Sequence, residues 1–328
     1  MKLHTVLLVL GIIGLAVVII LNLHQLSSFV KLLGDIKWYV LLLIIAVQIT
    51  SYYINGLYYK TILKLFGYEI KISRLVEGAL ASNFVNYIVP TAGVAGAGFL
   101  SQVLKPDVPR GKGFLTQIMR YTFSALAALL MIPLGILAIV STRHGNSTID
   151  HVAIVSAISI IVFGVIIVAL VEQHTILMKI VNWIAKKLKR FKKFNQKHFY
   201  KFVDDFYEGY RSIRNNKRGL LIPYVWSIVY ILVEILTLYL VFVAFGKFIN
   251  PGIVTMGYIM ANLASIFGGT FFSTGVFELG MIGTFLALGL PFVLALSVSV
   301  VYRIINLAVG MPPGFYYYHK YLNSKKIR

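Results

Sequence analysis

The sequence predicts an all-α integral membrane protein with six full transmembrane helices and two re-entrant helical hairpins in an inverted-topology repeat. Three observations support this fold class. Hydrophobic residues occupy 59% of the 328 positions, whereas soluble domains contain about 45–50%. Eight apolar stretches follow one another, and Gly and Pro interrupt two of them. Basic residues concentrate in alternate connecting segments, as expected where charge sets membrane topology.

The six continuous apolar stretches are long enough to cross a bilayer, which takes about 20 residues of helix. They are residues 5–23, 38–60, 114–140, 151–171, 220–246 and 292–317. The stretch after Lys2 lacks a small-x-small cleavage motif, so we interpret it as an uncleaved anchor. The interrupted stretches are residues 76–104 and 252–290. Because broken backbone inside a bilayer needs a protein or water environment, we expect each to enter and leave on one side.

We expect one polytopic membrane domain that contains two equivalent units. Residues 38–140 form the first predicted repeat and residues 220–317 the second, each with a span, a hairpin and a span. The other predicted segments are an N-terminal anchor span with its loop at residues 1–37 and an extra span at residues 141–171. A basic amphipathic cytoplasmic elbow follows at residues 172–219, and a basic cytoplasmic tail ends the chain at residues 318–328.

A short motif recurs in the two interrupted stretches. The sequence TAGVAGAG, at residues 91–98, returns 182 positions later as STGVFELG. Asn83 precedes the first copy and Asn262 the second, and a lone arginine follows each copy, at Arg120 and Arg303. Interrupted segments at matching places in two halves indicate a transporter-type binding site. The alternative is that Gly-rich membrane helices resemble one another by chance.

The charge distribution assigns both termini to the cytoplasm. In this topology, 25 of the 31 Lys and Arg residues lie inside, four lie outside and two lie within the membrane. The asymmetry is a strong positive-inside signal. In the topology assigned from these charges, the two hairpins enter the membrane from opposite sides, so the two predicted repeats have opposite orientations. We therefore expect a multi-pass protein of the cell (plasma) membrane.

The hairpin tips form the first part of the candidate substrate site. Thr91 and Gly93 lie at the first tip, and Thr274 and Gly275 at the second. A helix that begins after a tip presents free N–H groups and a positive dipole end, which favours an anion such as phosphate. The alternative is that these glycines only permit close helix packing.

Charged side chains within the apolar stretches form the second part of the site. They are Arg120, Glu234, Glu278 and Arg303, and such residues usually face a bundle interior or cavity. Arg120 is close enough to the cytoplasmic end of its span to extend toward the interface. We expect Glu278 to pair with Arg303, either as a structural ion pair or as contacts to a lipid amine and phosphate. Glu234 is a candidate proton relay or a partner for an arginine.

The polar segment 172–218 indicates two basic amphipathic helices. The second places six apolar residues on one face: Phe199, Phe202, Val203, Phe206, Tyr210 and Ile213. Such helices attract anionic lipids by roughly 1 kcal/mol per basic residue, or the segment serves as an elbow between the two halves. The net charge of +20 lies where membrane topology requires it, so we predict no nucleic-acid partner.

Enzyme signatures are absent from the sequence. There is no cysteine, which excludes disulfides, thiolate catalysis and cysteine-ligated metals. There is also no phosphate-binding Walker loop, no H-E-x-x-H and no G-x-S-x-G. The seven histidines are scattered. We predict no catalytic residue, no metal site and no cofactor.

The chain resembles the lysylphosphatidylglycerol synthase transmembrane family, a flippase-like family that includes the membrane half of the multiple peptide resistance factor. The resemblance covers about residues 1–320. It rests on Asn83 with the tip PTAG, on the segment STGVFE, on the dipeptide Tyr302-Arg303 and on the basic elbow. After the first tip, Gly96 and Gln102 stand where the family pattern has acidic and basic residues.

The resemblance implies a translocase that moves anionic or aminoacylated phospholipids, such as lysyl-phosphatidylglycerol, between leaflets. In bifunctional relatives a separate cytoplasmic domain attaches lysine from lysyl-tRNA to phosphatidylglycerol, and we expect no such domain here. The alternatives are a phosphatidylglycerol lysyltransferase, acting in lipid metabolism and resistance to cationic antimicrobial peptides, and a membrane receptor or scaffold. The expected partners are anionic phospholipid, the membrane, a separate aminoacyl-lipid synthase and a second copy of the chain.

Overall fold

The computed structural model describes residues 36–89, 93–141, 196–267 and 273–323, together with three single residues at 31, 34 and 91. Within these residues every regular element is a helix, as the sequence predicts. The predicted spans at 5–23 and 151–171, and the first amphipathic helix of the elbow, lie outside the described residues.

Among the described residues, four helices are long and apolar enough to cross a membrane: α3 (Trp38–Leu65), α6 (Arg110–Val140), α10 (Leu221–Ala244) and α13 (Phe292–Asn323). They correspond to four of the six predicted spans. Such runs become helical because a bilayer offers the backbone no hydrogen-bond partners. Prolines inside α6 and α13, at Pro133, Pro312 and Pro313, are compatible with membrane helices, where neighbouring groups satisfy the freed carbonyls.

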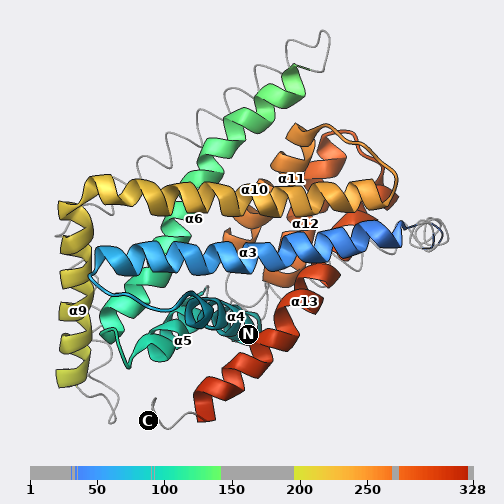
Figure 1. Ribbon diagram of the computed structural model, residues 1–328. Helices are drawn as coiled ribbons and strands as arrows, with labels where there is room; N and C mark the ends of the chain where they lie inside the picture. The colour runs from blue at the N-terminus through green and yellow to red at the C-terminus, as the bar shows by residue number, and fades with distance from the viewer. Residues whose placement is uncertain are drawn as a thin grey trace, which may run out of the picture.

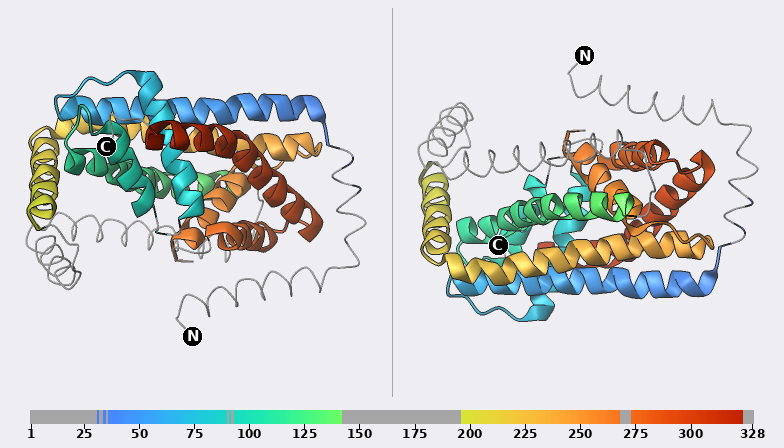
Figure 2. Two further views of the ribbon diagram at one scale, coloured as in Figure 1. Left: turned by 90° about the horizontal axis from the view of Figure 1, so that it is seen from below. Right: turned by 90° about the horizontal axis from the view of Figure 1, so that it is seen from above.

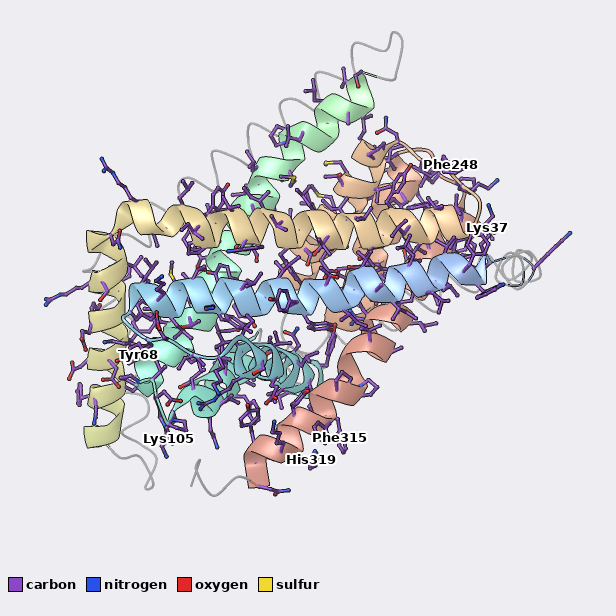
Figure 3. The ribbon with its side chains drawn as sticks, in the orientation of Figure 1. Lys37, Tyr68, Lys105, Phe248, Phe315 and His319 are labelled. Carbon is purple, nitrogen blue, oxygen red and sulfur yellow. The ribbon has the colours of Figure 1, made fainter. Side chains whose placement is uncertain are left out.

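The helices α3 and α10 lie side by side and antiparallel. The backbone N–H of Lys37, just before α3, donates to the carbonyl of Ala244 at the end of α10 over 2.9 Å. Lys37 and Phe248 lie at one end of this pair, and Tyr68 lies at the other (Figures 1 and 3). The views in Figure 2 show the same pairing from below and from above.

Each interrupted stretch forms two packed helices. The first hairpin consists of α4 (Ile72–Ile88) and α5 (Val94–Leu104). The second consists of α11 (Pro251–Phe267) and α12 (Ser273–Ala287). Val89 ends α4 in an extended conformation, as expected for a residue that precedes a proline. The longest of these arms has 17 residues and spans about 25 Å, which is shorter than the roughly 30 Å hydrocarbon core.

Each hairpin begins beside the end of the other unit's last long helix. Glu77 in α4 forms an ion pair of 2.8 Å with Lys320 near the end of α13. In the corresponding place, Asn250 before α11 donates its amide to the carbonyl of Ala138 near the end of α6, also over 2.8 Å. In these exchanged hairpin contacts, each hairpin touches the last long helix of the other predicted repeat. The first long helices of the two predicted repeats, α3 and α10, are antiparallel (Figure 1).

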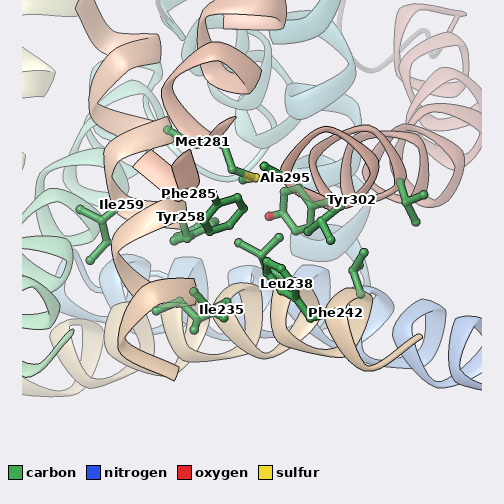
Figure 4. Packing of buried hydrophobic residues seen from close by; sticks show 14 of the residues in the cluster. Ile235, Leu238, Phe242, Tyr258, Ile259, Met281, Phe285, Ala295 and Tyr302 are labelled. Atoms are coloured by element: carbon green, nitrogen blue, oxygen red, sulfur yellow. The ribbon is translucent and has the colours of Figure 1, made fainter. Parts of the chain in front are cut away.

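The largest hydrophobic core lies between α10, the second hairpin and α13 (Figure 4). The rings of Phe242 and Phe285 are fully buried and meet edge to face, with centroids 5.3 Å apart. Gly257 faces Phe285 so closely that a Cβ atom there would overlap the ring. Because Gly257 of α11 has no side chain, the ring of Phe285 from α12 can pack closely against α11, and the two arms of the second hairpin stay in contact.

The helix α9 (Gln196–Asn215) crosses one end of the long helices and packs on the start of α6 (Figure 1). On its predicted apolar face, Val203 and Ile213 are buried. Lys112 in α6 forms an ion pair of 2.9 Å with Glu208 in α9. Because this apolar face is covered by protein, the structure favours the elbow interpretation for α9 over a helix lying in the headgroup plane. The short helix η2 (Lys217–Leu220) then leads into α10.

Candidate functional site

Arg303 and Glu278 form an ion pair between α13 and α12, as the sequence analysis predicted. The Nε atom of Arg303 lies 3.1 Å from Oε1 of Glu278, and the two side chains are 14% and 12% exposed. The guanidinium also faces two aromatic rings, at 5.4 Å from the ring centre of Tyr87 and 5.7 Å from that of Phe277. The pair therefore lies where the end of α4 meets the second hairpin and α13.

Glu278 also caps the helix on which it stands. Its Oε2 atom accepts a hydrogen bond from the backbone N–H of Gly275, in the first turn of α12. A carboxylate in this position is favoured by the helix dipole. Gly275 has a φ of 94°, a conformation that favours glycine. One carboxylate oxygen of Glu278 thus contacts Arg303, and the other accepts a hydrogen bond at the start of α12. The side chain of Thr274 lies outside the described residues.

Arg120 is enclosed by neighbouring helices, although its place in the sequence would have allowed it to extend toward the interface. It is 8% exposed, and its Nε atom donates to Oδ1 of Asn55 in α3 over 2.7 Å. Its guanidinium lies 5.2 Å from the ring centre of Tyr230 in α10. Because α6 turns this face toward α3 and α10, neighbouring side chains surround the arginine along its length. Among the described residues no carboxylate forms an ion pair with it.

Glu234 lies near the middle of α10 and is 3% exposed. Its Oε2 atom accepts a hydrogen bond of 2.7 Å from the hydroxyl of Tyr302 in α13. Its Oε1 atom accepts one of 3.3 Å from the amide of Gln48 in α3. In the part of the chain that the structure describes, no basic side chain forms an ion pair with Glu234. The arginine partner considered for it is therefore not found there.

Tyr87 lies among the charged side chains and was not singled out in the sequence. It stands at the end of α4 and is 36% exposed. Its side chain is close enough to interact electrostatically with Arg120, Glu234, Glu278 and Arg303. These four residues come from four different helices, and of the four only Arg303 has its side chain over the Tyr87 ring, at 5.4 Å, in the described part of the chain. The only sequence signal for Tyr87 is its position just before the first hairpin tip.

The first turn of α5 has no free N–H group, contrary to expectation. The N–H of Ala95 donates to the hydroxyl of Thr91 over 2.8 Å, and that of Gly96 to Oδ1 of Asn86 over 2.8 Å. The N–H groups of Val94 and Ala97 bond to backbone carbonyls of the tip. Thr91 therefore caps the helix, and its contact with a lipid headgroup stays a prediction.

The first tip is closed by a second set of contacts. The amide of Asn86 donates over 2.9 Å to the hydroxyl of Tyr121 in α6, while its oxygen accepts from Gly96. Gly93 has a φ of 87°, and a Cβ atom there would lie 2.7 Å from the Tyr121 hydroxyl. The asparagine chosen from the sequence, Asn83, is half-buried, whereas Asn86 is the residue that joins the two arms.

We expect Gly96→Ala to loosen the first hairpin. A Cβ atom at this position would overlap the amide of Asn86, and moving that amide leaves a buried N–H without a partner, at a cost of about 1–3 kcal/mol. Gly98→Ala is the matched control, because no atom lies within 4 Å of a Cβ there. Thermal unfolding in detergent should show a lower midpoint for Gly96→Ala alone. Equal midpoints for both variants would contradict this reading of the tip.

Asn262 does not reach the ion pair in this structure. Its amide donates over 2.8 Å to the carbonyl of Tyr258, one turn earlier in α11. Asn83 makes no side-chain hydrogen bond with another described residue. The substrate contacts predicted for these two asparagines, and for Gly93 and Gly275, therefore stay predictions.

An apolar groove lies between the first hairpin and the end of α13, near Phe315 and His319 (Figure 3). Its volume is about 410 Å³, and its aromatic lining includes Phe84, Phe99, Phe315 and Tyr318. Ligand pockets commonly measure about 300–1,000 Å³. Ile88 also lines the groove, so the end of α4 that carries Tyr87 flanks it. The groove has the chemistry to hold an acyl chain.

Comparison with known proteins identifies the family. The model described as the lysylphosphatidylglycerol synthase TM region matches residues 6–314. The chain belongs to this family. The match includes both hairpins and all four charged residues described above, and it confirms the resemblance seen in the sequence. With its four long apolar helices, this family member is a multi-pass membrane protein.

Two archaeal relatives are similar to the chain. A UPF0104 membrane protein of Methanothermobacter thermautotrophicus is 36% identical over 98 residues, which cover 30% of this chain and 29% of the relative. A UPF0104 membrane protein of Methanocaldococcus jannaschii is 23% identical over 296 residues, which cover 88% and 87% of the two chains. The first similarity is thus confined to less than a third of either protein, and the second extends nearly throughout.

Proposed function

We propose that this family member translocates phospholipids with anionic or aminoacylated headgroups between the leaflets of the cell membrane. The observation that carries the proposal is the ion pair of Arg303 and Glu278, which is held beside the accessible ring of Tyr87. A guanidinium suits a lipid phosphate because its planar fork donates two parallel hydrogen bonds. A carboxylate beside it suits the amine of an aminoacylated headgroup such as lysyl-phosphatidylglycerol.

The two units act in this proposal as an inverted-topology repeat, with the hairpins entering from opposite sides. The antiparallel pair α3 and α10 and the exchanged hairpin contacts support it. Transporters of this architecture bind their substrate at the interface of the repeats and expose it to each side in turn. The headgroup then lies at the ion pair, and the groove beside α4 supports an acyl chain. The six-span, two-hairpin arrangement includes the two predicted spans outside the described residues.

We expect the end of the molecule that carries α9 to face the cytoplasm. The chain has no cysteine, so single cysteines can be introduced at exposed positions. Arg211→Cys in α9 should react with an impermeant maleimide only in inverted vesicles or broken cells. Phe248→Cys, which is 77% exposed at the opposite end, should react in intact cells. Labelling of Arg211→Cys from outside would reverse the proposed orientation.

Leaflet exchange in proteoliposomes tests the transport activity. The purified chain should accelerate the exchange of labelled phosphatidylglycerol and labelled lysyl-phosphatidylglycerol, and should leave labelled phosphatidylcholine at the rate of protein-free vesicles. The charge-free variant Arg303→Met with Glu278→Gln serves as the control that keeps the helices but removes both charges. Exchange at the protein-free rate for all three lipids, from well-folded protein, would refute the proposal. Mass spectrometry of co-purified lipids would identify the preferred headgroup.

The description of the family as a synthase region favours one alternative, phosphatidylglycerol lysyltransferase. In our proposal a separate aminoacyl-lipid synthase supplies the lysylated lipid, and this chain moves it. Purified protein incubated with lysyl-tRNA and phosphatidylglycerol should therefore form no lysyl-lipid. A clear product that disappears in heat-denatured samples would establish the transferase instead.

A further inference from the structure

Glu234 is the one acidic residue of the four that the proposed headgroup site leaves unused. Its carboxylate is 3% exposed and accepts hydrogen bonds from Tyr302 and from Gln48. Both donors are neutral. A buried carboxylate near the middle of a membrane helix is costly without a cationic partner, and the described residues provide it with no ion pair. A proton is the smallest ligand that would remove this cost.

The surroundings of Glu234 contain one basic group and several phenols. The titratable and charged side chains that face it are Tyr52 on α3, Tyr87 on α4, Arg120 on α6, Tyr230 on α10, Tyr258 on α11 and Tyr302 on α13. The guanidinium of Arg120 is engaged by Asn55 and by the ring of Tyr230, which lies one helical turn before Glu234. Arg120 therefore acts on the carboxylate through space and leaves its protonation free to change.

Gln48 provides a second observation that points to a proton. It is 1% exposed, and its Nε2 atom donates to Glu234 and, over 3.0 Å, to Asn306. Its Oε1 atom is buried and accepts no hydrogen bond from a described residue. If the amide rotates by half a turn, the oxygen faces Glu234, which must then donate as a carboxylic acid. Because the same nitrogen also donates to Oδ1 of Asn306, the amide of Asn306 must turn together with that of Gln48, and the two amides can then serve either protonation state of Glu234.

Glu234 is connected to the headgroup site through Tyr302. The hydroxyl of Tyr302 bonds to Glu234, and its ring stacks on Phe277, with centroids 6.1 Å apart and planes 13° apart. Phe277 and Tyr302 are the chain neighbours of Glu278 and Arg303. A change of charge at Glu234 therefore alters a contact between α10 and α13 that lies one residue from the ion pair.

We propose that Glu234 is a proton-binding site that couples lipid translocation to proton movement. Its carboxylate takes a proton from water on one side to become a neutral acid and releases it to water on the other, so no other reactant is consumed. The neutral and charged forms favour different contacts among α3, α10 and α13. The coupling rests on the transport activity proposed above, whereas the proton site itself does not.

Infrared difference spectroscopy tests the proton site without reference to transport. Spectra of the reconstituted chain at stepwise pH should show a carbonyl band of a protonated carboxylic acid that disappears as the pH rises. The band should be absent from Glu234→Gln and present in the double variant Arg303→Met with Glu278→Gln, which keeps Glu234 and removes both charges of the ion pair. Tyr302→Phe should move the midpoint to higher pH, since the hydroxyl favours the carboxylate. A wild-type spectrum without the band, or one unchanged in Glu234→Gln, would overturn the site.

Lipid exchange under imposed pH gradients tests the coupling. Phosphatidylglycerol exchange is measured under two pH gradients of opposite sign. The two rates should differ severalfold in the wild-type protein and should be equal in Glu234→Gln. Thr237→Val is the matched control, because this buried hydroxyl on α10 bonds only to the carbonyl of Val233. It should retain the wild-type difference between the two rates. Exchange that responds to a sodium gradient and not to a pH gradient would refute proton coupling. A titrating band in a chain that moves no lipid would refute the proposed transport and leave the proton site standing.

Discussion

Arg303→Lys should remove most phospholipid exchange while the protein still folds and inserts. Lysine keeps the positive charge and can pair with Glu278, but it lacks the planar fork that binds a phosphate through two hydrogen bonds. It also stacks less well between the rings of Tyr87 and Phe277, which face the guanidinium in the structure. Losing one charge-assisted hydrogen bond of about 1.5–3 kcal/mol should slow exchange roughly tenfold or more. The measurement is exchange of labelled phosphatidylglycerol in proteoliposomes, with thermal stability in detergent recorded beside it.

The charge-free double variant separates a headgroup role from a structural one. Arg303→Met or Glu278→Gln alone leaves one charge of the buried pair without its partner, which is strongly destabilising. Combining them should restore much of the lost stability, because neither charge remains. We expect this stable double variant to be inactive. Full exchange activity in it would show that the ion pair only holds α12 to α13.

Gly257→Ala should destabilise the protein by overpacking the second hairpin. Its Cβ atom would overlap the ring of Phe285, which is fully buried against Phe242. Overpacking a core in this way typically costs about 1–3 kcal/mol. The ring has little room to move, because it is fully buried and packs against Phe242 of α10. The expected readout is a lower unfolding midpoint and earlier proteolytic cleavage within the second hairpin.

Gly283→Ala is the control for this prediction. Gly283 lies on α12, as Phe285 does, but a Cβ atom there has no other atom within 4 Å. Both substitutions replace a helical glycine by alanine, which by itself stabilises the helix by about 1 kcal/mol in each case. The difference between the two variants therefore measures the packing alone. If both unfold at the same midpoint, the arms of the second hairpin are further apart than the structure shows.

The order and approximate bounds of the helices in the described part follow from the sequence. Long apolar runs can only be helices in a bilayer, because no water is present to satisfy the backbone. This fixes α3, α6, α10 and α13 to within a few residues of the predicted spans. The two interruptions by Gly and Pro likewise mark where the hairpins turn, since those residues disfavour a continuous helix. The pairing of Glu278 with Arg303 was also predictable, because a buried charge needs a partner and the two residues lie on consecutive helices.

The partners of the remaining polar residues depend on how the helices pack against one another, and the sequence does not reveal them. From the sequence, Arg120 lies close enough to the cytoplasmic end of its span to extend toward the interface, but the packing of α6 against α3 and α10 encloses it beside Asn55. The helix end after the first tip was expected to be free, but Asn86 and Thr91 occupy its donors. Tyr87 and Gln48 gained their roles from contacts with helices far away in the sequence. The hydrophobic pattern and the charges of a segment indicate whether it lies in lipid or in water. The partner of a buried polar group depends instead on which helices the fold brings together.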